Sequence, residues 1–365
     1  MAKKAVAIHN RNIECMSTFP SVSIAIPAYN EAANIEAVVS GFLNQKYPGL
    51  VELLVADGGS TDGTQDIVKQ IAIKDPIVRL LHNPQRIQSA ALNLMLDESK
   101  GDIFLRADAH CDYAPDYIQS CVSALVESGA MNVGGAQRFV ANTHFQAGVA
   151  LASKSLLGNG GAKYRNPDYT GYADTVFLGC FWRKELVSIQ GFREEAVTNQ
   201  DAELNLRLLQ KHDRAIYVSS NIRVWYYPRK SLRSLWQQFY KYGRGRYLTS
   251  KRHPGKSPLR TKLPIIAILL FLAVSVLVTI SWGLYVTLTI VFLIITIPVL
   301  ESIRIALKYD SVFERDFWRG SQFDYPSFLS RCFYCWLALV IMPIAYASGG
   351  LFQRLRHDVL RKKGW

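Results

Sequence analysis

Four short polar clusters contain the residue types that bind nucleotides, coordinate metal ions and accept protons. They are Ala28-Tyr29-Asn30-Glu31, the string DGGSTDGT at residues 57–64, Asp108-Ala109-His110, and Gln200-Asp201. Carboxylates and imidazoles accept protons or ligate divalent cations, and glycine-rich turns let a ligand approach the backbone closely. Together these types indicate nucleotide binding, metal binding and general-base chemistry.

The string DGGSTDGT is the most specific of the four. Asp57 and Asp62 are able to accept hydrogen bonds from a base or a ribose, and the glycines leave room for the ligand. The alternative is an ordinary turn between a strand and a helix, with Thr61 or Asp62 as the N-cap. The chain has no GxxxxGK[ST] sequence, and no GxGxxG follows its first strand, so neither of these phosphate loops is expected.

Asp108 and His110 are two residues apart after an apolar segment, so both side chains are able to face one ion. A carboxylate with an imidazole suits Mn²⁺ or a similar divalent cation, and Mg²⁺ is the other candidate. Such an ion would bridge the diphosphate of a nucleotide donor and offset the charge on the leaving group. A DxH triplet also occurs without any metal role.

Asp201 opens a strongly helical stretch, AELNLRLLQK. Its carboxylate is a candidate N-cap of that helix and also a candidate general base that deprotonates an acceptor hydroxyl. The two roles are compatible, because a helix N-terminus favours the ionised carboxylate.

Strands and helices alternate along the first part of the chain, and the polar clusters follow the strands. This order predicts a parallel sheet with helices on both faces, in which ligands bind at the carboxyl ends of the strands. The expected strands are Val22–Pro27, Val51–Ala56, Ile77–His82 and Asp102–Arg106, and the expected helices are Glu31–Asn44, Thr64–Ile73 and Ile87–Glu98.

Two apolar runs, Lys262–Ser281 and Leu284–Leu300, are separated by Trp282-Gly283. Each is long enough to cross about 30 Å of hydrocarbon, so they predict a transmembrane hairpin, with a buried soluble hairpin as the alternative. A third apolar run, from Phe328 to about Leu351, is interrupted by Arg331, Pro343 and Gly349-Gly350. If it spanned, the basic tail would lie outside, so a re-entrant or interfacial segment is preferred.

The net charge of +13 is concentrated before the first apolar run. Residues 228–262 contain eleven Lys or Arg and no Asp or Glu, which fits the cytosolic side of a membrane, with nucleic-acid binding as the alternative. Within it, Ser231–Tyr247 has the pattern of an interfacial amphipathic helix whose arginines are able to meet a diphosphate or remain solvated. The first twenty residues have no apolar run typical of a signal peptide, and the six cysteines are expected to be free thiols in a reducing compartment.

In their order along the chain, these clusters resemble those of family 2 glycosyltransferases of the GT-A fold, over about residues 20–250. Residues 156–165 (LLGNGGAKYR) and the apolar hairpin look like the succinoglycan-biosynthesis ExoA-type branch. The resemblance implies single-displacement, inverting transfer from a nucleotide-activated sugar. It implies Asp201 as the base, a divalent metal at Asp108 and His110, nucleotide-sugar contacts from Pro27, Ala28, Tyr29, Glu31, Asp57, Asp62, Arg86 and Asp108, and an acceptor pocket formed by Gly179, Cys180, Phe181, Gln200, Trp236, Arg244 and Arg246.

The chain departs from the family pattern at three places. The usual DxD is DxH here, which leaves the metal open, and the usual acidic pair at the base is Gln200-Asp201. At the position of the QxxRW sequence of processive synthases, the chain has the degenerate residues 238–242, which favours addition of a single sugar. Residues 177–182 could line the sugar pocket or form a core strand, and the glycines of residues 153–165 suggest a lid.

The sequence therefore predicts an α/β GT-A domain with a mixed, mostly parallel sheet, followed by a C-terminal membrane helical region. The expected activity is transfer of one sugar from a nucleotide sugar, with UDP chosen by frequency alone, to a lipid-linked saccharide at the cytoplasmic face of a bacterial inner membrane, in cell-surface or exopolysaccharide biosynthesis. The alternatives are a non-catalytic membrane scaffold and nucleotidyl transfer onto a sugar phosphate. The expected regions are an N-terminal extension (1–20), the catalytic domain (21–228), a basic interfacial segment (229–262), the hairpin (263–303), a polar connector (304–327) and the third apolar segment with its tail (328–365).

Overall fold

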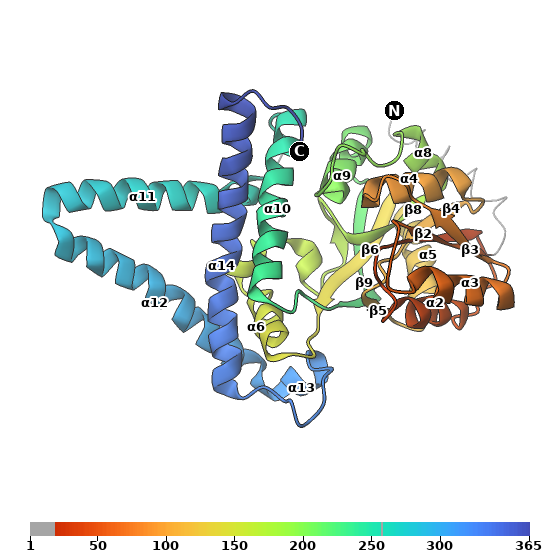
Figure 1. The fold of residues 1–365 in the computed structure, drawn as a ribbon, viewed down its shortest axis with the longest axis horizontal. Helices are drawn as coiled ribbons and strands as arrows, with labels where there is room; N and C mark the ends of the chain where they lie inside the picture. The colour runs from red at the N-terminus through yellow and green to blue at the C-terminus, as the bar shows by residue number, and fades with distance from the viewer. Residues whose placement is uncertain (1–18, 257) are drawn as a thin grey trace.

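The computed structural model describes residues 19–256 and 258–365, and shows a sheet domain joined to a set of long helices (Figure 1). The sheet has nine strands in the order β3-β2-β1-β4-β8-β6-β9-β5, with β7 paired to β9. The strands are β1 (Val22–Ala28), β2 (Leu50–Asp57), β3 (Val78–His82), β4 (Ile103–Arg106), β5 (Cys111–Tyr113), β6 (Asn132–Phe139), β7 (Gly171–Tyr172), β8 (Phe177–Trp182) and β9 (Ile216–Tyr226). The predicted α/β fold with a mixed, mostly parallel sheet is confirmed.

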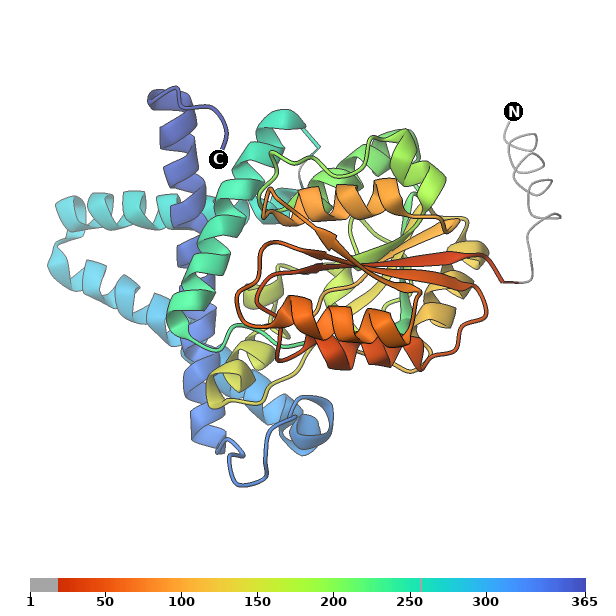
Figure 2. The ribbon, with the colours of Figure 1, turned by 45° about the vertical axis from the view of Figure 1, so that its right-hand side comes forward.

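The first four strands are parallel because a helix connects each to the next. Figure 2 shows these helices covering both faces of the sheet. Their apolar residues are buried against the strands, so the carboxyl ends of β1, β2 and β4 come together at one edge. The connecting helices are α2 (Ile35–Leu43), α3 (Thr64–Lys74) and α4 (Gln88–Glu98), and each predicted strand and helix lies within a few residues of its observed counterpart.

The second half of the sheet is mixed. The antiparallel strand β8 lies between β4 and β6, and β6 pairs in parallel with the long strand β9. Helices α5 (Tyr117–Ser128), α8 (Arg183–Ser188) and α9 (Gln200–Lys211) complete this half. The chain leaves β9 at Tyr226 and enters α10 (Leu232–Arg252), so the sheet leads directly into the helical region.

Helices α10 and α14 (Phe328–Arg354) lie side by side along the edge of the sheet domain (Figures 1 and 2). Glycines permit their close approach: a Cβ on Gly243 would lie 1.9 Å from the Tyr346 carbonyl oxygen, and one on Gly349 would lie 2.0 Å from that of Tyr240. Helix α6 (His144–Ala152) is packed on α14 in the same way at Gly148. The long helices are therefore an integral part of the molecule.

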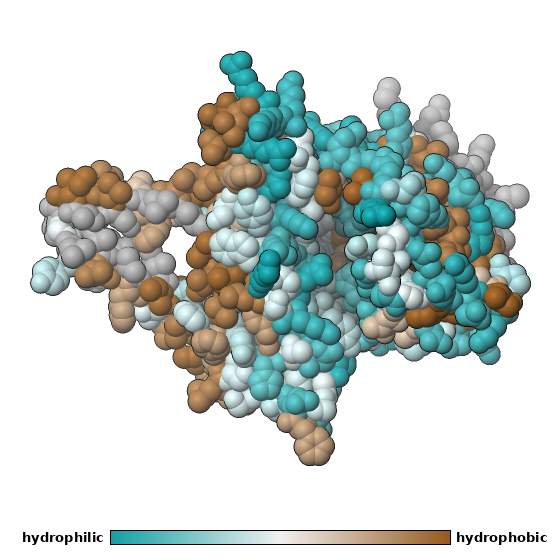
Figure 3. Space-filling model, viewed as in Figure 1, coloured by the Kyte–Doolittle hydropathy of each residue, from teal (hydrophilic) through white to brown (hydrophobic). Residues whose placement is uncertain are grey.

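The predicted hairpin appears as two helices, α11 (Leu263–Trp282) and α12 (Leu284–Tyr309), joined at Gly283 in a left-handed conformation with φ of 82°. In Figures 1 and 2 both helices project away from α14 to the side opposite the sheet domain. Large apolar side chains such as Leu270, Leu277 and Phe292 are exposed on them. Figure 3 shows this apolar surface continuing over the outer side of α14.

The third apolar segment forms one uninterrupted helix, α14, which continues through Pro343. Among the described residues, Phe328–Val359 is the one helix long and apolar enough to cross a membrane. The polar connector before it contains the short helix α13 (Phe313–Asp316). Residues 1–18, which make up most of the predicted N-terminal extension and include Cys15, lie outside the described residues; the five described cysteines are free.

Candidate active site

The predicted polar clusters meet because their strands are neighbours. In the pairing of β1 with β2, Ala28 lies opposite Asp57, and in the pairing of β1 with β4, Ala25 lies opposite Arg106. The loops that follow these strands therefore emerge at the same edge of the sheet.

Asp57 organises the turn that follows β2. Its Oδ1 accepts hydrogen bonds from the Gly59 and Ser60 amides at 2.8 and 2.9 Å and from Gln65 Nε2 at 2.7 Å. Its Oδ2 accepts a bond from the Ser60 hydroxyl at 2.5 Å. Both carboxylate oxygens thus hold the loop, and Asp57 is almost completely buried.

Asp62 joins the loop after β2 to the loop after β1. It accepts bonds from the Thr64 hydroxyl at 2.5 Å and from the Ala32 amide at 3.0 Å, and these hydrogen bonds lower the pKa of Asp62. Helix α3 begins after Gly63, and Asp62 accepts the amide of Thr64, its first residue, at 3.1 Å. In this structure the bonds of Asp62 hold the turn, but the N-cap of α3 is Gly63 and not Thr61 or Asp62.

Two long side chains flank the glycine turn. A Cβ on Gly58 would lie 3.5 Å from the Tyr29 ring, and one on Gly59 would lie 3.4 Å from Nε of Arg86. Tyr29 is 57% exposed, and Arg86 has a φ of 57°. Pro27 and Ala28 end β1, where Ala28 is buried, and none of these four residues lines the main cavity.

Asp108 and His110 line a cavity of about 700 Å³ between the sheet domain and the long helices. The Tyr113 hydroxyl accepts a bond from the Asp108 amide at 2.7 Å and donates to the Asp108 carbonyl, which fixes the backbone here. His110 Nδ1 lies 3.2 Å from Glu31 Oε1, so Nε2 is the ring nitrogen left for an ion. Burial disfavours the imidazolium, but the bond to Glu31 and the charge of Asp108 outweigh it and raise the pKa of His110.

Asp201 lines the same cavity and is linked to Asp108 through Arg106. The buried guanidinium donates from Nη1 to Asp201 and from Nη2 to Asp108, the latter at 3.2 Å. A second link runs from Gln200 Nε2 to Gln88 Oε1 at 2.5 Å, and from Gln88 Nε2 to Asp108 at 3.4 Å. Loss of hydration raises the pKa of Asp201, and the charge of Arg106 opposes that rise.

The loop before Asp201 is held in place from both sides. The N-cap of α9 is Asn199, with φ of 66° and its side chain bonded to Thr249 on α10, so Asp201 is not the N-cap. Two residues after Asp201, Glu203 is fully buried and paired with Arg207 and His253, the latter at 3.0 Å. These bonds fix Asp201 relative to α10.

Of the predicted acceptor residues, the structure places some in the cavity wall and others elsewhere. Gln200 and Arg246 line the cavity. Gly179, Cys180 and Phe181 lie inside β8, where Cys180 and Phe181 are each 1% exposed, so the core-strand interpretation describes them. The cavity is instead lined by the residues just before them, Thr175–Phe177.

Trp236 and Arg244 also lie outside the cavity wall, because they are on other sides of α10 than the residues that line the cavity. Arg244 donates to Gln353 Oε1 at 2.9 Å and lies over the Trp365 ring at 4.1 Å, so it binds α14 and the tail. The face of α10 that lines the cavity comprises Ser234, Gln237, Gln238, Phe239, Lys241, Tyr242 and Arg246.

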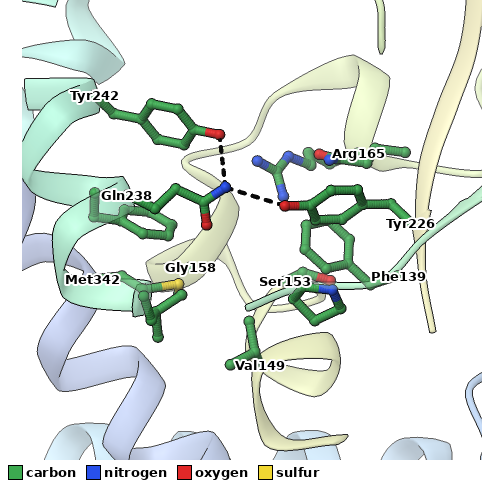
Figure 4. A pocket seen from close by; sticks show the side chains of 13 residues that line it. Phe139, Val149, Ser153, Gly158, Arg165, Tyr226, Gln238, Tyr242 and Met342 are labelled. Carbon is green, nitrogen blue, oxygen red and sulfur yellow. Dashed lines mark hydrogen bonds between the residues drawn. The ribbon is translucent and has the colours of Figure 1, made fainter. Parts of the chain in front are cut away.

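Several cavity residues were not singled out as site residues by the sequence. In Figure 4, Gln238 Nε2 donates to the hydroxyls of Tyr226 and Tyr242, at 3.1 and 3.0 Å, and Arg165 lies beside them. Tyr226 also contacts the His110 ring, with centroids 5.9 Å apart. In the sequence, the only sign of a role for Arg106 is that it is a charged residue at the end of an otherwise apolar strand. Nothing in the sequence indicates that Gln88 belongs to the site.

The comparisons with known proteins agree with this fold. The sequence profile of the family described as "Glycosyl transferase family 2" matches residues 23–182. The chain is similar to the succinoglycan biosynthesis protein ExoA of Rhizobium meliloti, with 37% identity over 250 residues, which is 68% of this chain and 76% of that protein.

Two further relatives cover more of the chain. A dolichyl N-acetyl-alpha-D-glucosaminyl phosphate 3-beta-D-2,3-diacetamido-2,3-dideoxy-beta-D-glucuronosyltransferase from Methanococcus voltae is 27% identical, over 79% of this chain and 88% of that protein. Among solved structures, a Pyrobaculum calidifontis mannosyltransferase in complex with GDP-Man and Mn²⁺ aligns with a TM-score of 0.54 and 17% identity, over 93% of this chain and 89% of that one. The match of sequence and fold over this length shows that the chain belongs to glycosyl transferase family 2 and is a glycosyltransferase.

Proposed function

We propose that this glycosyltransferase moves one sugar, with inversion, from a nucleotide sugar to a lipid-linked saccharide at the cytoplasmic face of a membrane, in exopolysaccharide or cell-surface biosynthesis. The observation that carries the proposal is that Asp108, His110 and Asp201 line one cavity. Its volume of about 700 Å³ suits a sugar with part of a nucleotide and an acceptor end. UDP is the carrier to test first.

In the proposed mechanism, Asp201 accepts the proton of the acceptor hydroxyl as that oxygen attacks the anomeric carbon, opposite the departing nucleoside diphosphate. Arg106 keeps the Asp201 carboxylate ionised and directed toward the cavity. Inversion follows because the attack is a single displacement, so an α-linked donor yields a β-linked product.

The residues present fit a divalent ion shared with the donor. Among the described residues, no three His, Cys, Asp or Glu side chains converge on a metal position, so the protein would supply Asp108 and His110, and diphosphate oxygens would complete the coordination. The bond of Glu31 to Nδ1 leaves Nε2 of His110 available, as is common for metal-bound imidazoles. The ion would supply charge neutralisation on the leaving diphosphate.

The helical region supports membrane association. At about 1.5 Å per residue, α11 with its 20 residues is about 30 Å long, the thickness of a hydrocarbon layer. Both hairpin helices project from the same side of α14 (Figure 1). We infer that the hairpin enters the membrane while α14 and α10 lie along its cytoplasmic surface, since α14 runs across the base of the hairpin.

This arrangement predicts equal membrane depths along α14. Fluorescent probes attached at cysteine-substituted Phe333, Ile344 and Phe352, which are 53%, 40% and 44% exposed, are expected to be quenched equally and only by shallow brominated lipids. A probe on Leu277 of the hairpin, the positive control, is expected to be quenched by deep bromines. Deepest quenching at Ile344, in the middle of α14, would instead show that α14 spans the bilayer.

Release of nucleoside diphosphate from a panel of sugar donors tests the catalytic proposal. Detergent-purified protein with a membrane lipid extract is expected to turn over one donor with Mn²⁺ or Mg²⁺ and to lose turnover in EDTA. His110→Ala is expected to raise the metal concentration needed for half-maximal rate about 10- to 100-fold, because one of two protein ligands is lost.

His144→Ala is the matched control, because His144 lies outside the cavity, near Ser330 of α14, and no change in metal requirement is expected. Equal turnover in EDTA and in metal would remove the metal from the mechanism. Absence of both turnover and binding for every donor would favour the second candidate, a membrane scaffold with a degenerate transferase domain.

A further inference from the structure

A short turn in the cavity wall is hydrogen-bonded to the second helix of the hairpin. This α7 turn, residues 155–161, contains the short helix α7 (Leu156–Asn159), and its residues 157–160 line the cavity. Ser155 is the N-cap of α7, because its hydroxyl oxygen accepts the Leu157 amide at 3.1 Å. The same hydroxyl donates to Oε1 of Glu301 on α12 at 2.5 Å. Ser155 is completely buried, so water does not compete for this bond.

The other hydrogen bonds of the α7 turn are local. Asn159 donates to the Ser153 carbonyl at 3.1 Å and accepts the Gly161 amide at 2.7 Å. The Ser155 carbonyl accepts the amides of Gly158 and Asn159, so the backbone closes on itself. Within the described part of the chain, the bond from Ser155, which spans 146 positions, is therefore the one hydrogen bond that ties the turn to a distant element.

Glu301 is itself held firmly at the end of the hairpin. Arg304, one turn later on α12, donates to both of its carboxylate oxygens, at 2.7 and 2.8 Å. The neighbouring Ile305 and Ala306 are buried in the core, so this end of α12 is packed into the molecule. Glu301 is also the first charged residue after the apolar run Leu284–Leu300. In the membrane placement proposed above, it lies where α12 leaves the hydrocarbon.

The α7 turn is also connected to the residues proposed to bind the donor. A Cβ on Gly158 would lie 2.0 Å from the Ala152 carbonyl oxygen, so the turn is packed closely on the end of α6. Arg165, which follows the turn, lies beside Tyr226 in Figure 4, and the Tyr226 ring contacts the His110 ring, with centroids 5.9 Å apart. Displacement of the turn would therefore alter the cavity wall beside His110.

We propose that Glu301 is a positioning residue for donor binding: through Ser155 it holds the α7 turn where the nucleotide sugar requires it. This inference rests on the proposed function and gives the hairpin a role besides membrane attachment. Without the bond, the turn occupies its binding position for only part of the time, and the apparent dissociation constant of the donor rises by the same factor. The reacting groups are unchanged, so the rate at saturating donor is expected to remain.

The kinetic test replaces Glu301 in the full-length protein. Glu301→Ala is expected to raise the KM for the donor about 10- to 100-fold, the value of a hydrogen bond to a charged group, with kcat within about twofold. Glu301→Gln keeps an acceptor oxygen for Ser155 and is expected to restore most of the donor affinity. Glu314→Ala is the matched control, because Glu314 is exposed, bonds to Gln322 and lies outside the cavity wall.

Hydrogen exchange measures the α7 turn without any turnover. The amides of Gly158 and Asn159, which bond to the Ser155 carbonyl, are expected to exchange at least about 10-fold faster in Glu301→Ala. UDP with Mn²⁺ is expected to slow their exchange in the unmodified protein. In a Ser155→Ala background, Glu301→Ala is expected to have no further effect on exchange or on KM, because both substitutions remove the same bond.

Faster exchange with an unchanged donor KM would show that the bond only stabilises the turn, and would overturn the proposal. A rise confined to the KM for the acceptor would assign the turn to the acceptor and overturn it as well. A further effect of Glu301→Ala in the Ser155→Ala background would mean that Glu301 acts through another group. If the unmodified protein turns over no donor, the proposed function fails separately, and UDP affinity with Mn²⁺ decides the inference: equal affinity in Glu301→Ala would overturn it.

Discussion

Asp201→Asn is expected to reduce sugar transfer by about 10²- to 10⁴-fold, the range for loss of a general base. The substitution keeps the shape of the side chain but removes its ability to take a proton from the acceptor. Donor affinity is expected to stay near that of the unmodified protein, because the proposed nucleotide contacts are elsewhere. Transfer of radiolabelled sugar at saturating donor and acceptor measures the effect.

Asp213→Asn is the matched control, since Asp213 lies just beyond the other end of α9, outside the cavity wall. Thermal unfolding of both variants separates catalysis from stability, because Asp201 also pairs with Arg106. Retention of transfer within a few-fold in folded Asp201→Asn would mean that another group accepts the proton. In that case the link through Arg106 would be structural.

The sheet edge could be predicted because the relevant signals are local. An apolar, β-branched run followed by Gly, Asp or Asn indicates a buried strand and its turn, and short crossovers force parallel strands to share an edge. Asp57, Asp108 and Asp201 were selected on such signals and on the family resemblance, and the structure brings Asp108 and Asp201 into one cavity. The position of Asp201 depended on the resemblance, since nothing local places α9 opposite β4.

The acceptor side could not be predicted in the same way. Residues 177–182 are apolar and suit either a pocket or a strand, and the pairing of β8 with both β4 and β6 made them core. Arg244 and Arg246 are alike in sequence, but two residues on a helix point about 200° apart. Only the packing of α10 against α14 decides that Arg246 faces the cavity and Arg244 the tail.

The links around the carboxylates depend on contacts between residues far apart in the chain. Arg106 meets Asp201 across 95 positions, and Gln200 meets Gln88 across 112. A single sequence contains no trace of such a pairing. One departure from the family pattern is explained by these links. Gln200 stands where the family usually has an acidic residue. Its amide is linked to Asp108 through Gln88 and adds no charge to the site.

Arg106→Gln is expected to lower transfer by at least about 10²-fold and to move the acidic limb of its pH profile to higher pH. Without the guanidinium, Asp201 loses its favourable charge, and the negative charge of Asp108 and the loss of hydration both raise the Asp201 pKa further. The base needs to be ionised, so activity at low pH is lost first. Initial rates between pH 5 and pH 9 measure this shift.

Stability is expected to fall as well, by up to about 3–5 kcal/mol, because removing Arg106 leaves the buried carboxylate of Asp108 uncompensated. Arg106→Lys keeps the positive charge, but a lysine cannot donate to Asp201 and Asp108 as the two ends of a guanidinium do. It is therefore expected to return the acidic limb of the pH profile toward its original pH while the rate of transfer stays low. Arg138→Gln is the matched control: Arg138 is half-buried and donates to the backbone carbonyls of Pro167, Ser220 and Ile222, so its loss destabilises the fold without moving the limb. An unmoved limb in folded Arg106→Gln would mean that the limb does not report the ionisation of Asp201, because a charge this close to Asp201 cannot be removed without changing its proton affinity.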